Sequence, residues 1–216
     1  MQIKSLFWEF DRLQLKHWDK NLDAIYGWGE IINPKFFFVF MNPTWKNVAS
    51  NKEWKWLKAQ WIWTKNIWKM FYQLWFLDKN IFEKSQSKKS TERDYNFAET
   101  LYQEIKKNWI YITNLSKATQ VDARPLNNNV FKDYLELLKQ EIDEIKPKTI
   151  ITFWNQVSSI FLNKNIQVWL YRKKFEITEI NKIFYKTFPV YYPVWQGMRN
   201  MKIAQEDINW IKDNLD

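Results

Sequence analysis

The chain has 216 residues, with 33 Lys and Arg against 24 Asp and Glu, no cysteine, and a single histidine, His17. The absence of cysteine excludes disulfides, thiolate metal sites and cysteine nucleophiles, and one histidine excludes any mechanism that needs two. The net charge of +9 favours a polyanionic partner such as nucleic acid, although a merely basic protein has the same charge.

The length predicts one domain, residues 1–216. The segment MQIKSLFWEFDR mixes charged and aromatic residues, and no stretch approaches the roughly 20 apolar residues of a membrane span. We therefore expect a cytoplasmic monomer with no membrane partner, no metal cluster and no cofactor.

Short apolar runs that alternate with amphipathic segments predict the secondary structure. In chain order we expect a strand at 36–42, a helix at 64–76, a solvated loop at 84–94, a helix at 96–107, a strand at 109–115, a helix at 131–145, a strand at 149–154, a helix at 155–162, a weaker hairpin at 175–188, a strand at 188–194 and a helix at 201–214. This alternation predicts an α/β protein, namely a three-layer α/β/α fold with a central, mainly parallel four-stranded sheet.

In such sheets ligands bind beyond the carboxyl ends of the strands. Four segments lie at the carboxyl ends of predicted strands: Met41-Asn42-Pro43, Asn114 to Lys117, Trp154-Asn155, and Tyr192 to Asn200. Each is also an ordinary turn sequence when it is taken alone. Their order along the chain is more informative than any one of them.

The ordered set INPKFFFVFMNPTW, AQWIWTKNIWKMF, WIYITNLSKATQVDARPL, IKPKTIITFWN and YYPVWQGMRN resembles the uracil-DNA glycosylase superfamily, from about Asn33 onward. Members place an Asn-Pro-Gly or related motif after the first strand, where this chain has Asn42-Pro43-Thr44-Trp45. A later strand of the family ends in an asparagine or in Thr-Asn-x-x-Lys, which matches Thr113 to Lys117. The last motif, usually His-Pro-Ser, corresponds to Tyr192-Pro193-Val194.

The resemblance implies a DNA repair enzyme that flips uracil out of DNA and hydrolyses its N-glycosidic bond, with no cofactor and a nucleoid-associated location. The implied catalytic residues are Asn42 and Tyr192, and the implied base pocket is Met41, Pro43, Trp61, Asn114 and Pro193. The implied DNA contacts, Met198 and Arg199 among them as wedge candidates, are Lys117, Arg124, Gln196, Met198, Arg199 and Asn200.

Two departures from the family pattern affect the chemistry. The cysteines of the iron-sulfur branch are missing, and Tyr192 stands where well-known members have the histidine that donates to the departing uracil. Asn42 can position a water but cannot deprotonate it, and Asp122 is an alternative base. A non-catalytic reader of deaminated or single-stranded DNA, or a glycosylase for another deaminated or mismatched base, therefore remains an alternative. A nucleotide-binding α/β domain of another kind is a third possibility, but this chain contains neither a P-loop motif nor a dinucleotide-binding glycine motif.

Tryptophan and glycine occur in unusual proportions, 15 and 3 residues, whereas glycine is normally about 7% of a chain. The family pattern or turn chemistry favours glycine at six tryptophans, whereas Trp61 and Trp68 stand where a large apolar residue is expected. The six are Trp45, Trp63, Trp75, Trp109, Trp154 and Trp195. Our hypothesis is that UGA codons read as glycine in the source organism are rendered as tryptophan in this sequence; the alternative is a truly tryptophan-rich protein.

Overall fold

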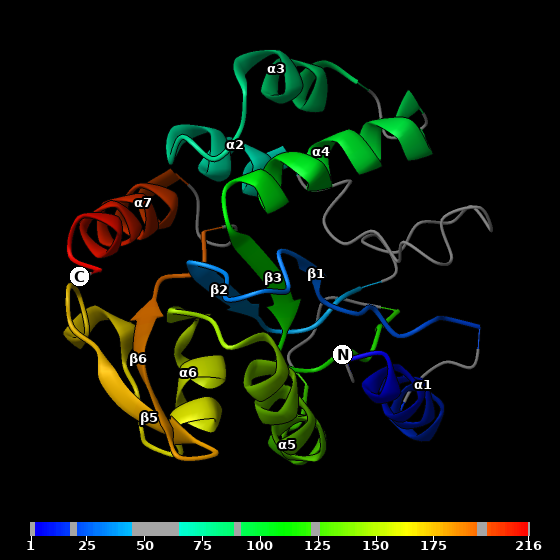
Figure 1. The fold of residues 1–216 in the computed structure, drawn as a ribbon, viewed down its shortest axis with the longest axis vertical. Helices are drawn as coiled ribbons and strands as arrows, with labels where there is room; N and C mark the ends of the chain where they lie inside the picture. Colours follow the sequence, from blue (N-terminus) through cyan, green and yellow to red (C-terminus); the bar gives the residue numbers. More distant parts are fainter. Residues whose placement is uncertain are drawn as a thin grey trace.

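The centre of the molecule is a six-stranded mixed sheet in the order β1-β3-β2-β4-β6-β5 (Figure 1). The computed structural model describes residues 3–17, 21–44, 65–88, 92–121, 126–193 and 198–215, with only the backbone of 198 and 199. The strands are β1 (Trp28–Gly29), β2 (Phe36–Phe40), β3 (Ile110–Asn114), β4 (Thr149–Phe153), β5 (Glu176–Ile180) and β6 (Ile183–Val190). The α/β class is confirmed.

The predicted sheet of four strands is wrong in size. The strands β3, β2, β4 and β6 do pair in parallel, but β1 and β5 add antiparallel edges. With two residues, β1 is too short to leave a sequence pattern. The strand predicted at 188–194 is also displaced, because β6 is a single strand that continues from the hairpin and ends at Val190. Beyond it, Pro193 has no N–H to donate to a ladder.

Seven α-helices lie within the described ranges. They are α1 (Ser5–His17), α2 (Lys65–Gln73), α3 (Lys79–Ser87), α4 (Tyr95–Lys107), α5 (Asn128–Ile145), α6 (Asn155–Leu162) and α7 (Met198–Asp213), with a 3-10 turn at Val168–Leu170. The five predicted helices are confirmed, and α1 and α3 were not predicted. The loop predicted at 84–94 is wrong for its first part, which belongs to α3. Asp94 is the N-cap of α4, and its carboxylate accepts a hydrogen bond from the Phe97 N–H at 2.8 Å.

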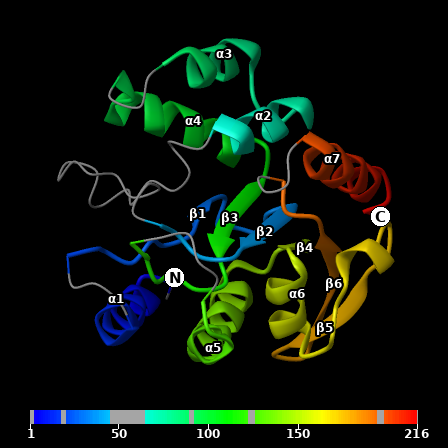
Figure 2. The same cartoon turned by 180° about the vertical axis from the view of Figure 1, so that it is seen from behind.

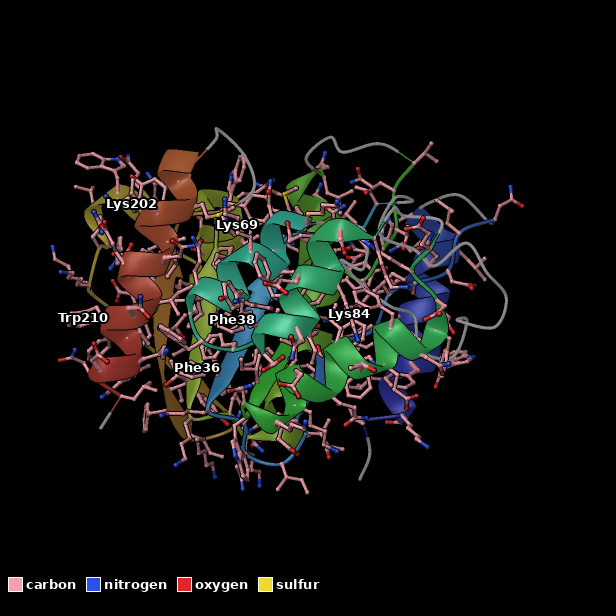
Figure 3. All side chains as sticks on the ribbon, turned by 90° about the horizontal axis from the view of Figure 1, so that it is seen from above. Phe36, Phe38, Lys69, Lys84, Lys202 and Trp210 are labelled. Carbon is pink, nitrogen blue, oxygen red and sulfur yellow. The ribbon has the colours of Figure 1, made fainter. Side chains whose placement is uncertain are left out.

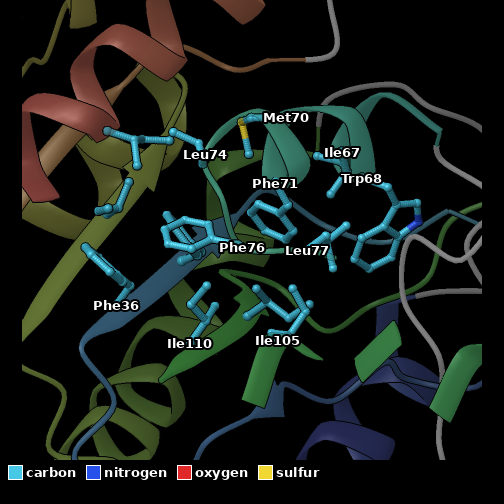
Figure 4. Packing of buried hydrophobic residues seen from close by; sticks show 14 of the residues in the cluster. Phe36, Ile67, Trp68, Met70, Phe71, Leu74, Phe76, Leu77, Ile105 and Ile110 are labelled. Carbon is cyan, nitrogen blue, oxygen red and sulfur yellow. The ribbon is translucent and has the colours of Figure 1, made fainter. Parts of the chain in front are cut away.

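Successive side chains of the strands point into two separate hydrophobic cores, one on each face of the sheet. Phe36 and Phe38 point into an upper core with α2, α4 and α7, whereas Phe37 and Val39 point into a lower core with α1, α5 and α6. Figure 1 shows these helices on opposite sides of the sheet, and Figure 3 shows the upper helices from above. Figure 4 shows the aromatic packing of the upper core. All five residues of β2 are buried, as expected for a central parallel strand.

The two connections that follow β2 along the chain lie on opposite faces of the sheet. The chain passes from β2 to β3 through α2, α3 and α4 on the upper face, and from β3 to β4 through α5 on the lower face. Figure 2 shows β4 between β2 and β6. The strand order therefore reverses beside β2, and the carboxyl ends of β2 and β4 form the topological switch point of the sheet.

The backbone separates two kinds of tryptophan. Trp75, Trp109 and Trp154, the three described positions of the six predicted to favour glycine, have φ values of 63°, 56° and 83°. The described tryptophans outside that set, Trp8, Trp28, Trp68, Trp169 and Trp210, are absent from the residues with positive φ. Other non-glycine residues with positive φ are Asn or Lys, and a bulky residue there is an outlier.

Two of these positions have a recognisable use for glycine. Trp75 ends α2 with the paired bonds of a Schellman motif, in which its N–H donates to the Tyr72 carbonyl and the Phe76 N–H donates to the Phe71 carbonyl. Trp154, at φ 83° and ψ 150°, occupies a region of conformational space that is essentially restricted to glycine. Trp68, by contrast, is fully buried in the upper core. These conformations support the glycine hypothesis at 75, 109 and 154, while positions 45, 63 and 195 lie outside the described residues.

Candidate functional site

The candidate site lies at the switch point, where the segments that follow β2, β3, β4 and β6 come together. The ring of Phe40 at the end of β2 stacks on Phe153 of β4 at 4.5 Å and contacts Tyr192 edge-on at 6.2 Å. On the other side, the Leu115 N–H donates to the Phe40 carbonyl at 2.7 Å and the Ser116 N–H donates to the Met41 carbonyl at 3.1 Å. The strand ends predicted to bear the site are thus neighbours.

Asn42 is the second residue after β2 and is half-buried. Its Nδ2 donates to the Pro43 carbonyl at 3.1 Å, whereas its Oδ1 is buried and accepts no hydrogen bond from any described residue. A buried amide oxygen without a donor is costly, and a water or a ligand N–H would satisfy it. Next to it, Pro43 is buried and Met41 packs against the lower core.

Asn114 is the last residue of β3 and is 1% exposed. It pairs with Phe40 in the parallel register, which brings it beside the start of the Asn42 segment. The two segments stay together further along, because the Gln120 N–H donates to the Pro43 carbonyl and Thr44 forms a bridge with Gln120. Asn42 and Asn114 therefore lie in adjacent segments at the carboxyl ends of β2 and β3.

Tyr192 follows β6 and packs against the upper core. Burial raises the pKa of its phenol to about 12, so the hydroxyl keeps its proton at neutral pH and can donate a hydrogen bond. Its ring contacts Phe40 and, at 5.8 Å, the indole of Trp154. Pro193, the next residue, is buried.

Trp154 fills space within this site. It lies between β4 and α6, its N–H donates to the Val190 carbonyl at 3.0 Å, and its half-buried indole meets Tyr192 edge-on. A glycine at this position removes the strain of the backbone and leaves a volume the size of an indole beside Tyr192. The site is therefore roomier if the glycine hypothesis holds.

Lys117 does not have the exposed position expected of a DNA contact. Its side chain is 0% exposed and its ammonium lies 2.7 Å from Glu141 Oε2. Burial lowers the pKa of Lys117, and the Glu141 carboxylate opposes this shift. A phosphate cannot reach an ammonium enclosed in this way, and we correct its role to a structural one.

The other implied DNA contacts are only partly placed. Met198 and Arg199 lie in the first turn of α7 and not in a loop, and the partly buried Asn200 follows them. Trp61, Arg124 and Gln196 lie outside the described residues, as does the alternative base Asp122. His17, at the end of α1, bonds to Asp133 at 2.9 Å.

Sequence reasoning missed Glu141 and Tyr111. The Tyr111 hydroxyl donates to Glu141 Oε1 at 2.7 Å, and both side chains are buried. A signal was present, because Glu141 falls on the apolar stripe of α5 that includes Leu138, Ile142 and Ile145. A carboxylate on a buried stripe requires a partner.

Comparison with protein-family models and with curated protein sequences gives no match. Among the described residues, no group of three His, Asp or Glu side chains could hold a metal ion, and no helix is long and apolar enough to cross a membrane. The function must therefore be argued from the site itself.

Proposed function

We propose that this protein is a monofunctional DNA glycosylase that flips uracil out of DNA and hydrolyses its N-glycosidic bond. The observation that supports the proposal is that the segments bearing Asn42, Asn114 and Tyr192 are neighbours at the carboxyl ends of the parallel strands. These are the three residues for which the family resemblance implies water positioning, base reading and leaving-group stabilisation. The implied stacking residue, Trp61, belongs to the same proposal.

The proposed chemistry divides between the two sides of the scissile bond. Cleavage develops positive charge on the sugar and negative charge on the departing uracil. The neutral Tyr192 phenol donates a hydrogen bond to that uracil, and the amide of Asn114 pairs with the uracil edge, which an amide can do as donor and acceptor. The Asn42 Oδ1 accepts a hydrogen bond from the attacking water, which adds to the already cationic sugar and then loses its proton to solvent, while the uracil anion departs.

The target base must leave the duplex to reach the site. An enzyme that acts on a base extrudes it from the stack at a cost of a few kcal/mol, and the net charge of +9 supplies attraction to phosphate. Asn114 is almost fully buried, so a base has to enter past the side chains around it. A glycine at position 154 would ease that entry.

A second candidate is a protein that reads deaminated or single-stranded DNA without cutting it. It is favoured by the chemistry of Asn42, since an amide cannot deprotonate a water, and by Glu141, whose buried carboxylate is occupied by Lys117 and Tyr111. A glycosylase for another deaminated or mismatched base has the same residues and differs in pocket shape.

The test uses the full chain with glycine at the six tryptophan positions and a uracil-containing oligonucleotide, either single-stranded or paired with guanine. Alkali-labile abasic sites at the uracil are expected, with their loss in Asn114→Ala. Matched oligonucleotides with thymine in place of uracil control for nonspecific cleavage. Tight uracil-dependent binding without cleavage would favour the reader, and neither activity would overturn both candidates.

A further inference from the structure

The buried ammonium of Lys117 lies directly behind the candidate site. Three groups surround Nζ at hydrogen-bond distance: Thr113 Oγ1 at 2.6 Å, the Asn114 carbonyl at 2.6 Å and Glu141 Oε2 at 2.7 Å. An ammonium has three N–H donors, so each acceptor takes one. We propose that Lys117 is a positioning residue whose ion pair with Glu141 clamps the carboxyl end of β3 and thereby fixes Asn114 in the site.

The clamp acts on the backbone of Asn114. At the end of a strand, a buried carbonyl needs a donor outside the ladder. The chain turns after β3 and brings the Lys117 side chain back over the strand end, where it donates to that carbonyl. The orientation of the Asn114 peptide is therefore tied to a side chain that cannot rotate freely.

Glu141 anchors the clamp to α5. Its Oε1 accepts from the Tyr111 hydroxyl at 2.7 Å while its Oε2 accepts from Lys117. The ring of Phe10, from α1, lies 5.1 Å from the Lys117 Nζ and covers it. Three elements, β3, α5 and α1, therefore hold one ammonium in place.

The clamped loop also holds the loop of Asn42. The N–H groups of Leu115 and Ser116 donate to the carbonyls of Phe40 and Met41. Movement of the strand end would break these bonds, so the pair Lys117 and Glu141 sets the distance between the two amide-bearing loops. The assignment to base positioning rests on the proposed function, whereas the clamp itself does not.

The stabilities of a single and a double variant should differ, because the Lys117 and Glu141 charges are both buried. A buried ion pair can often be replaced by neutral groups at little cost, whereas the loss of one partner leaves an uncompensated charge. Lys117→Met alone should therefore destabilise the fold. Lys117→Met with Glu141→Gln removes both charges and keeps an acceptor for the Tyr111 hydroxyl, so it should recover the part of the melting temperature that the unpaired carboxylate costs.

The test compares this double variant with Lys139→Met and Glu136→Gln, an exposed ion pair on the same helix at 2.7 Å. Hydrogen exchange at the Leu115 and Ser116 amides is measured for each full-length protein, together with kcat and KM for uracil release. In the Lys117 and Glu141 double variant we expect at least tenfold faster exchange at both amides and a fall in kcat larger than any rise in KM. The control pair should change neither.

Unchanged exchange at both amides in a double variant of recovered stability would overturn the clamp, because a pair that contributes only stability predicts that result. Faster exchange with an unchanged kcat would overturn the positioning role. Exchange does not depend on catalysis, so a wild-type protein that releases no uracil would defeat the proposed function without obscuring the exchange result.

Discussion

The substitution Trp75→Gly should stabilise this protein, which is unusual for the removal of a tryptophan. The Trp75 side chain is 82% exposed, so its deletion forfeits little burial. Its φ of 63° places the backbone in the left-handed region, which costs a residue with a Cβ roughly 1–2 kcal/mol. Glycine avoids that cost but adds about 0.4–1 kcal/mol of unfolded-chain entropy. The net gain is about 0.5–1 kcal/mol.

The matched control is Trp8→Gly. Trp8 is also exposed, at 67%, but it lies inside α1 and is absent from the residues with positive φ. Glycine in a helix interior costs about 0.5–1 kcal/mol. Since 1 kcal/mol shifts Tm by about 2–4 °C for a chain of this size, Trp75→Gly should raise Tm by about 1–4 °C and Trp8→Gly should lower it by a similar amount.

Thermal unfolding monitored by circular dichroism measures both shifts. Equal losses of Tm in the two variants would refute the reasoning, because they would mean that the Trp75 backbone carries no left-handed strain. A rise confined to Trp75→Gly supports glycine as the native residue there.

Further outcomes follow from the site. Tyr192→Phe keeps the ring contacts with Phe40 and Trp154 but removes the donor, so kcat for uracil release should fall on the order of 10²-fold with little change in Tm. Burial raises the pKa of Tyr192 to about 12, whereas a free tyrosine ionises near 10. This phenol therefore contributes stability that is complete below about pH 10 and lost as the pH rises through about 12. The free energy of unfolding should fall less between pH 9 and pH 11 in Tyr192→Phe than in the wild type. Asn42→Asp supplies a carboxylate that can accept a proton from water, and should raise kcat by roughly tenfold or more in single-turnover assays; a rate equal to or below that of the wild type would argue against Asn42 as the water-positioning group. The gene should carry UGA codons at 45, 63 and 154, and UGG there would refute the glycine hypothesis.

The helices and strands that were predicted well are those with a long, regular pattern of apolar residues. The buried run at 36–40 and the apolar stripe of α5 are long enough to identify a strand and a helix. The edge strand β1 was missed because two residues carry no period, and the predicted strand at 188–194 was displaced because the hairpin arm and the parallel strand are one continuous β6. Edges and junctions depend on pairing partners that are distant in sequence.

The site shows the same division. The sequence places Asn42, Asn114 and Tyr192 near the ends of predicted strands, whereas the order of those strands in the sheet is known only from the structure. The role of Lys117 could not be predicted, because a lysine in a basic protein favours a phosphate contact, whereas its burial depends on Glu141, 24 residues further along the chain. Only the packing of α5 on β3 brings the two charges together.

Mass spectrometry of free uracil released from a uracil-containing oligonucleotide, with DNA in excess over the six-glycine protein, distinguishes a glycosylase from a reader. We expect more than one uracil released per protein molecule, and none from the same protein with Asn114→Ala. Uracil-dependent binding with no free uracil, or equal release by the Asn114→Ala variant, would contradict the proposed glycosylase function.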